Sequence, residues 1–285
     1  MKTVTKANLG LQLAVMLFGG AGLFARFSGL SASQLLLGRT FLAACCLFFF
    51  LPNAYTLIRK NYSLSLRLGA LLALHWWSFF MAIQEGSLAL GVISFAAFPL
   101  FTVLLRPIVG QGAWSPSDMK RSLWLLLGVF LLLIPSLKAG DLLYVQAWGW
   151  GLCSAISFAL LSWTNKKALM QLDANTLAFL QNFGAFLFAA FWQLGWLESW
   201  PSRPLPYLYL LLLGLVFTAA AHFLYIWALG RLRTEQVSLM ASLEPIYAIF
   251  WAMLLLGEYP RIEELFAAFF ILGAIFWPRN RLKEN

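Results

Sequence analysis

The chain alternates between long apolar runs and short polar connections from one end to the other. Runs long enough to cross a bilayer cover residues 9–27, 33–51, 66–84, 88–108, 121–137, 147–169, 175–194, 206–229, 234–256 and 262–277. The longest connections are residues 52–65 and 109–120, so no water-soluble catalytic domain fits between the runs. This pattern predicts an all-α integral membrane protein with ten transmembrane helices.

The connections also indicate how the chain is oriented in the membrane. Most of the 20 Lys and Arg residues fall on the side that would hold both termini if ten segments cross. Cytoplasmic loops are enriched in Lys and Arg. We therefore expect a multi-pass protein of a bacterial inner (plasma) membrane with both termini in the cytoplasm.

An internal repeat becomes visible when the chain is shifted by about 146 residues. Phe79–Leu105 then lies over Tyr225–Trp251, which aligns Pro99 with Pro245. Five runs separate the two copies, and an odd number inverts the second copy in the membrane. The sequence thus predicts two inverted five-helix repeats, 1–137 and 147–277, around a central cavity, an arrangement used by transporters.

Glu244 and Pro245 interrupt the ninth apolar run. A charge near the bilayer centre costs roughly 2.5 to 3.5 kcal/mol, so such a residue is a candidate functional group. Proline weakens the helix ladder, and we expect Pro99 and Pro245 to act as hinges. In an unbroken helix Tyr247 and Trp251 would share a face with Glu244 and form an aromatic wall. The alternative is a protonated Glu244 hydrogen-bonded to a neighbouring helix.

Arg39 is another charged residue inside an apolar run, in this case the run at residues 33–51. Its guanidinium suits a substrate carboxylate, although snorkelling to the interface is equally compatible with its position. Trp76 and Phe80 share a helix face at i, i+4 on the third run. Their rings can line a substrate cavity or simply pack against lipid and protein.

Thr218, His222 and Tyr225 form a polar stripe at i, i+4 and i+7 on the eighth run. A polar stripe is not expected to face lipid, so His222 is a better candidate than His75 for a buried histidine. His222 could relay a proton with Glu244 or only bridge two helices. These residues complete the candidate substrate-binding set, which consists of Glu244, Arg39, Trp76, Phe80, His222, Tyr225, Tyr247 and Trp251.

Composition excludes several function classes. The residues are 61% hydrophobic and 11% charged, and the mean hydropathy is +0.79, which a soluble domain would not combine. The net charge of +9 comes from scattered basic residues, so we expect no nucleic-acid partner. The three cysteines form no CxxC motif, and no catalytic triad, phosphate loop or metal cluster is recognisable. We expect no enzyme activity, no cofactor and no metal.

The ten short runs in two halves, with LEPIYAIFWAMLLLGE in the ninth, resemble the EamA-type members of the drug/metabolite transporter superfamily. The likeness covers essentially the whole chain, and its most specific piece is Glu244-Pro245 followed by Leu256-Gly257-Glu258. The first half keeps Pro99 but has Phe98 where the second has Glu244. The resemblance implies a ten-helix basket with a central cavity and export of amino acids or related metabolites by alternating access.

Three functional hypotheses follow. The first is a secondary transporter of a small amino acid or similar zwitterion, in which Arg39 meets the carboxylate and Glu244 binds the amine or a proton. The second is uptake of a cationic or nucleoside-like metabolite by the aromatic wall and Glu244. The third is a lipid flippase or a non-transporting scaffold. The expected partners are a small-molecule substrate, the lipid bilayer and protons, and ten spans suffice for a monomeric pathway.

Overall fold

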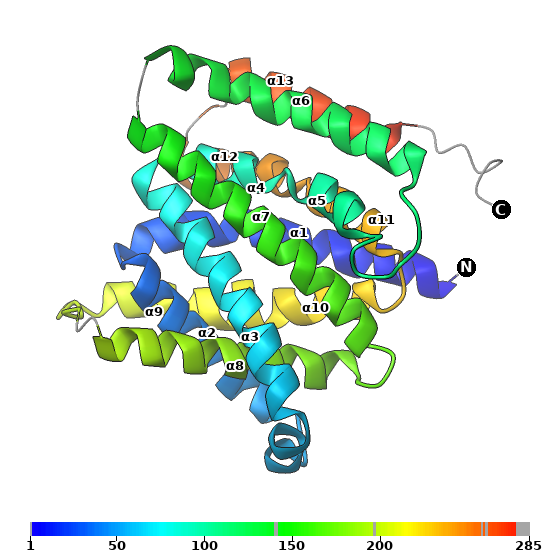
Figure 1. Ribbon diagram of the computed structural model, residues 1–285. Helices are drawn as coiled ribbons and strands as arrows, with labels where there is room; N and C mark the ends of the chain where they lie inside the picture. Colours follow the sequence, from blue (N-terminus) through cyan, green and yellow to red (C-terminus); the bar gives the residue numbers. More distant parts are fainter. Residues whose placement is uncertain (1, 140–141, 196–197, 258, 260–261, 278–285) are drawn as a thin grey trace.

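The fold is a bundle of helices in the computed structural model of the chain (Figure 1). The structure describes residues 2–139, 142–195, 198–257, 259 and 262–277. Regular structure in these residues is entirely helical. The terminal Glu258 of the family-like motif lies outside the described residues.

The first half of the chain forms six helices. They are α1 (Lys2–Ser28), α2 (Ala32–Phe48), α3 (Ala54–Glu85), α4 (Leu88–Phe95), α5 (Phe98–Leu105) and α6 (Pro116–Ala139). Ser31 begins α2 with a capping box, in which its hydroxyl accepts from the Gln34 amide and the Gln34 side chain accepts from the Ser31 amide.

The second half forms the remaining helices. They are α7 (Leu142–Ala168), α8 (Ala174–Gly195), α9 (Leu205–Gly214), the π-helix η1 (Leu215–Ala220), α10 (Ala221–Leu229), α11 (Thr234–Ala241), α12 (Glu244–Leu256) and α13 (Ile262–Phe276). Asp173 caps α8, because its carboxylate accepts bonds from the Asn175 and Thr176 amides. Partial burial raises the pKa of Asp173, but these bonds and the one from the Thr176 hydroxyl outweigh it and hold the pKa below its ordinary value.

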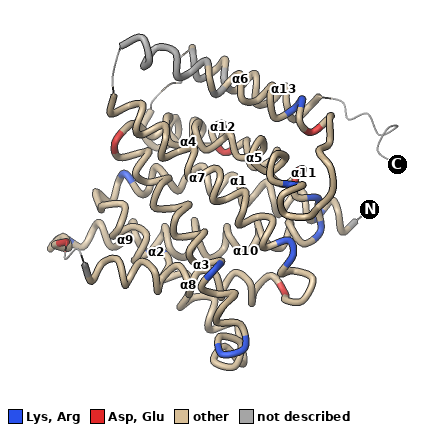
Figure 2. Tube along the Cα trace, in the orientation of Figure 1, with Lys and Arg blue, Asp and Glu red and all other residues tan. Residues whose placement is uncertain are grey.

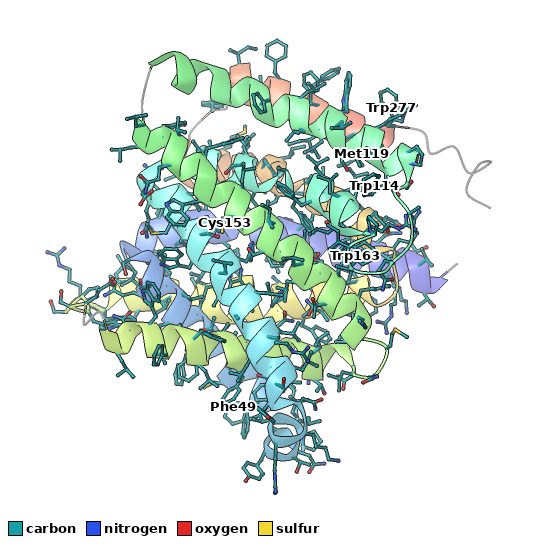
Figure 3. The ribbon with its side chains drawn as sticks, viewed as in Figure 1. Phe49, Trp114, Met119, Cys153, Trp163 and Trp277 are labelled. Carbon is teal, nitrogen blue, oxygen red and sulfur yellow. The ribbon has the colours of Figure 1, made fainter. Side chains whose placement is uncertain are left out.

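Seven helical segments in the described part of the chain are long and apolar enough to cross a membrane. Three of them join consecutive elements, at Leu88–Leu105, Leu205–Leu229 and Thr234–Leu256, and α2 is a shorter apolar helix. Large apolar side chains such as Phe49, which is 84% exposed, lie on the outer surface (Figure 3). The Lys and Arg positions lie mainly near helix ends (Figure 2). These features are those of an all-α, multi-pass membrane protein.

Two of the apolar runs are broken helices rather than bent ones. Residues 96–97 separate α4 from α5, and residues 242–243 separate α11 from α12. Pro99 and Pro245 are each the second residue after a break, in the first helical turn, where a missing N–H leaves no helical bond unmade. The sequence predicted a hinge at a proline within one continuous helix. In the structure one helix ends and, after two residues, the next helix begins.

The two breaks occur at matching positions. α4 begins at residue 88 and α11 at residue 234, 146 positions later, and α5 and α12 begin at residues 98 and 244 with the same separation. This is the shift at which the two sequence segments align. The described backbone therefore repeats its broken helices at the spacing that the sequence indicated.

Small residues allow the helices to approach closely. A Cβ atom at Gly69 of α3 would collide with the backbone of Gly184 on α8. A Cβ at Gly19 of α1 would lie 2.7 Å from Cβ of Tyr247 on α12. Such contacts are common where membrane helices pack without a hydrophobic driving force. They bring α3 against α8 and α1 against α12, while α6 and α13 pair along one side of the molecule (Figure 1).

Candidate functional site

A narrow cavity lies where eight helices converge, among them α4, α11 and α12 of the two broken segments. Its total non-atom volume is about 440 Å³, including space open to the outside. The lining residues come from α1, α2, α3, α4, α7, α10, α11 and α12; they are Phe18, Ala21, Arg39, His75, Trp76, Phe79, Phe95, Phe158, His222, Ala241 and Glu244. Mostly aromatic walls with a few polar groups are typical of a small-molecule site.

Arg39 is held on three sides. It is 1% exposed, its Nε donates to Thr218 Oγ1 at 2.9 Å, and its guanidinium lies 3.8 Å from the Trp76 ring centroid and 5.2 Å from that of Phe80. Trp76 and Phe80 are one turn apart on α3, as the i, i+4 spacing predicted. Arg39 thus lies inside the protein and does not reach for the membrane interface.

Glu244 is the first residue of α12 and is 5% exposed. A carboxylate at a helix N-terminus interacts favourably with the helix dipole. In the part of the chain that the structure describes, no ion pair joins Glu244 to Arg39, although the two charges interact electrostatically. Opposite charges that line one cavity without contact leave both groups open to a ligand.

Two histidines contribute further polar groups. The ring Nδ1 of His222 lies 3.4 Å from the Asn182 side-chain nitrogen, whereas its Nε2 is buried without a hydrogen-bond partner. His75 Nδ1 lies 2.8 Å from Ser154 Oγ. The sequence favoured His222 over His75, but the structure brings both to the cavity. Asn182 of α8 approaches through His222 and does not line the cavity itself.

Four residues of the candidate set lie outside the lining. Phe80 is buried and reaches the site only through its contact with Arg39. Tyr225 is fully buried, and its hydroxyl pairs with Ser162 Oγ at 2.9 Å. Tyr247 donates to Gln12 Oε1 at 2.8 Å, and Trp251 Nε1 donates to the Met16 carbonyl at 2.8 Å. Tyr247 and Trp251 therefore attach α12 to α1, so the aromatic wall near Glu244 comes from other helices.

Sequence reasoning missed most of the aromatic lining. Phe18, Phe95 and Phe158 belong to α1, α4 and α7, and each looks like one of 26 phenylalanines in an apolar run. Helical spacing relates residues within one helix only. The one signal available was indirect, because Phe95 precedes the helix break that Pro99 indicates.

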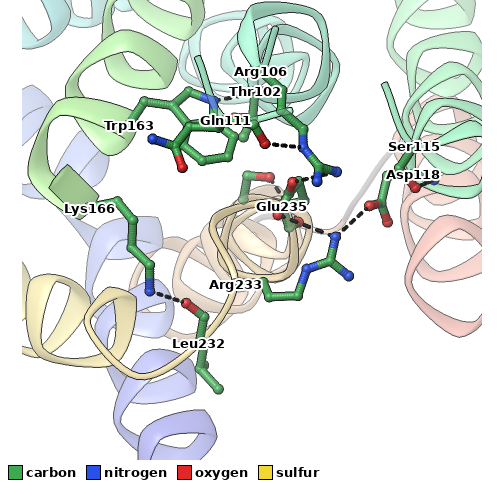
Figure 4. Close-up of polar contacts among 11 residues, drawn as sticks. Thr102, Arg106, Gln111, Ser115, Asp118, Trp163, Lys166, Leu232, Arg233 and Glu235 are labelled. Atoms are coloured by element: carbon green, nitrogen blue, oxygen red, sulfur yellow. Dashed lines mark hydrogen bonds and ion pairs between the residues drawn. The ribbon is translucent and has the colours of Figure 1, made fainter. Parts of the chain in front are cut away.

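An ionic network lies beyond the cavity, at the end of α5 and the start of α11 (Figure 4). Arg106 Nη1 lies 3.2 Å from Glu235 Oε1, and Arg233 Nη2 lies 3.1 Å from Asp118 Oδ2 and 3.5 Å from Glu235 Oε2. Lys166 Nζ donates to the Leu232 carbonyl at 2.7 Å. The network joins α5, α6 and α11 where the loops meet.

Comparison with known proteins agrees with this architecture. The model of the EamA-like transporter family matches residues 147–277. A solved structure titled "Crystal structure of protein" aligns with a TM-score of 0.74 and 18% identity, over 95% of this chain and 95% of that one, a likeness of fold alone. No curated protein matches the sequence. The family match confirms the resemblance to EamA-type transporters, so the function class indicated is a membrane transporter of small molecules.

Proposed function

We propose, from the EamA-like segment at residues 147–277, that the chain is a secondary transporter built as ten membrane spans in two inverted repeats, 1–137 and 147–277. The shared 146-residue spacing of the helix breaks supports the repeat. In this proposal α2, α6 and α13, which are not among the seven candidate segments, complete the ten spans. With an odd number of spans per repeat, the halves have opposite orientations and both termini lie on the same side. The excess of Lys and Arg on that side makes it the cytoplasmic one.

The substrate is an amino acid or a similar small zwitterion. One observation carries this proposal: Arg39 and Glu244 line the same cavity with opposite charges and no ion pair between them in the described structure. Burying charges without partners is costly. A ligand with a carboxylate and an ammonium group satisfies both, while the rings of Trp76 and Phe158 cover its apolar part.

Transport proceeds by alternating access, with the cavity opening to each side of the inner membrane in turn. The breaks before Pro99 and Pro245 are the positions at which the half-helices can rotate without breaking a continuous hydrogen-bond ladder. Export is favoured over uptake by the family resemblance. Glu244, which lines the cavity together with His222, is the candidate group for proton coupling.

The test is counterflow in proteoliposomes loaded with a mixed amino-acid pool. The wild-type protein should accumulate one class of labelled solute, and Glu244→Gln should lose gradient-driven accumulation because the neutral amide cannot form an ion pair with an ammonium group or exchange a proton. Exchange that survives in Glu244→Gln would assign Glu244 to proton coupling.

Controls separate the cavity from the rest of the protein. Glu85→Gln removes a carboxylate that pairs with Trp150 outside the cavity lining, and Arg26→Gln removes an exposed arginine of α1; both should transport normally. Unchanged accumulation and pH dependence in Glu244→Gln would contradict the proposed role.

A second function, uptake of a cationic or nucleoside-like metabolite, is favoured by the five aromatic rings beside Glu244. Arg39 in the same cavity repels a simple cation, which places this function second. Competition of counterflow by choline-like cations would support it. Binding of no water-soluble solute, together with activity restored by lipid, would favour a flippase instead.

A further inference from the structure

The π-helix in the eighth span gives Thr218 an unusual position. Residues Leu215–Ala220 form this wide turn between α9 and α10, and such turns within α-helices are frequent at functional sites. Thr218 is fully buried, and its hydroxyl donates to the Leu213 carbonyl, five residues back, at 2.6 Å. A hydroxyl has a single proton to donate. Its oxygen can therefore only accept from Arg39.

The contact with Arg39 decides which nitrogens remain for a ligand. Nε donates to Thr218 at 2.9 Å, and the Trp76 ring covers the guanidinium. Arginine can grip a carboxylate through Nε and one terminal nitrogen, or through its two terminal nitrogens. Thr218 occupies Nε, so only the second geometry is left. Within the described residues, neither terminal nitrogen has a hydrogen-bond partner.

Close helix packing keeps Thr218 within reach of α2. A Cβ atom at Gly214 would lie 2.6 Å from Cβ of Leu42, and one at Gly38 would collide with the Leu210 side chain. Both glycines lie at the interface of α2 with α9. Gly38 directly precedes Arg39, and Gly214 lies four residues before Thr218. The approach that brings Arg39 to the π-helix thus depends on the absence of side chains at these positions.

We propose that Thr218 is the positioning residue that fixes Arg39, so that its two terminal nitrogens receive a substrate carboxylate end-on. This inference rests on the proposed function for the identity of the cavity, and it adds a residue that sets specificity for carboxylates. Thr218 does not touch the substrate; it acts through the orientation of the guanidinium.

The experiment measures equilibrium binding to the purified full-length protein with three probes. They are phenylalanine, 3-phenylpropanoate, which lacks the amine, and 2-phenylethylamine, which lacks the carboxylate. Thr218→Val keeps the shape and removes the acceptor. It should weaken binding of both carboxylates about tenfold and leave the amine unchanged. Thr218→Ser should restore wild-type affinities. In Arg39→Gln, adding Thr218→Val should cause no further loss.

Thr102→Val is the matched control, because Thr102 is equally buried and its hydroxyl also donates back to a carbonyl, that of Phe98 at 3.0 Å. It should leave all three affinities unchanged. Equal loss for the amine in Thr218→Val, additive losses with Arg39→Gln, or failure of both carboxylates to bind wild type would overturn the proposal.

The proposed function is tested separately. Thr218-dependent carboxylate binding without counterflow of any solute would uphold the positioning role and contradict transport. Counterflow of the amine alone, insensitive to Thr218, would uphold transport and overturn the role of Thr218.

Discussion

The two broken helices share a backbone but not a chemistry. α4 and α11 are both 8 residues long, and the same two-residue break follows each of them. After the break α5 starts with Phe98, packed between Phe95 and Phe158 at ring distances of 5.7 and 5.0 Å. α12 starts with Glu244, which faces the cavity. The same break thus occurs in both halves, whereas only the second half has a charged residue directly after it.

The two pairs of half-helices also differ in charge away from the breaks. On one side of the cavity Arg106, after α5, pairs with Glu235 of α11. On the other side α4 meets α12, and α4 contains no charged residue. In two inverted repeats, the contacts that close the cavity on its two sides, α5 with α11 and α4 with α12, would have equivalent backbones. The ion pair between Arg106 and Glu235 strengthens the contact of α5 with α11. We therefore expect the cavity of the resting protein to be closed on that side.

The largest expected effect comes from removing the charge that distinguishes the second break. Glu244→Phe makes α12 begin as α5 does. The counterflow rate should fall about 100-fold, because the ligand loses its charged partner in a buried site. Phe98→Leu is the control and should retain transport. Wild-type counterflow in Glu244→Phe would show that the charge has no part in the cycle.

Placing a glutamate at the first break, by Phe98→Glu, should destabilise the fold and should not create a second binding site. Phe98 is 1% exposed and does not line the cavity. Phe98→Glu should therefore lower the stability by about 3 kcal/mol, since the carboxylate replaces ring packing and finds no water. Thermal unfolding in detergent measures this, with Phe98→Leu expected to cost about 1 kcal/mol. Equal stability of both variants would contradict this reading of the first break.

The ion pair between Arg106 and Glu235 can be removed by a substitution at either residue. With the native cysteines replaced, Ala241→Cys in the cavity reports access from the side of the ionic network through labelling by an impermeant maleimide added on that side. Arg106→Gln and Glu235→Gln should each raise the labelling rate about tenfold. The double variant should add little, because both changes remove one interaction.

Arg231→Gln is the control for this experiment, since Arg231 is exposed and lies over the Trp227 ring without an ion pair in the described structure. It should leave the labelling rate unchanged. Labelling that rises equally in Arg231→Gln, or that is unaffected in Arg106→Gln, would mean that the network does not close the cavity.

The smallest effect is expected at the prolines. Pro99 and Pro245 lie in the first turns of α5 and α12, where proline fits. Pro99→Ala and Pro245→Ala should each change stability by less than about 1 kcal/mol, and equally, since the breaks match. Thermal unfolding measures both. A loss of several kcal/mol at one position would show that the two breaks are not equivalent.

The sequence alone determined the membrane-protein class and the resemblance to EamA-type transporters. Apolar runs and their spacing are local properties of the sequence and can be recognised without tertiary contacts. The same is true of Glu244, because the free-energy cost of a charged residue in an apolar segment follows from its position alone. The 146-residue shift was readable because both halves keep a proline at the same position. The EamA-like match over residues 147–277 agrees with these features.

Only the tertiary structure decided which residues meet. Tyr247 and Trp251 share α12 with Glu244, yet they hydrogen-bond to α1. Phe18 and Phe158 are far from Glu244 in sequence and line the same cavity. In a protein with apolar residues on every helix face, helical period does not tell which face is interior, because lipid is as apolar as the core. In the structure, close contacts at glycines and the π-helix at Thr218 mark faces that pack inside the protein. Both features depend on neighbouring helices.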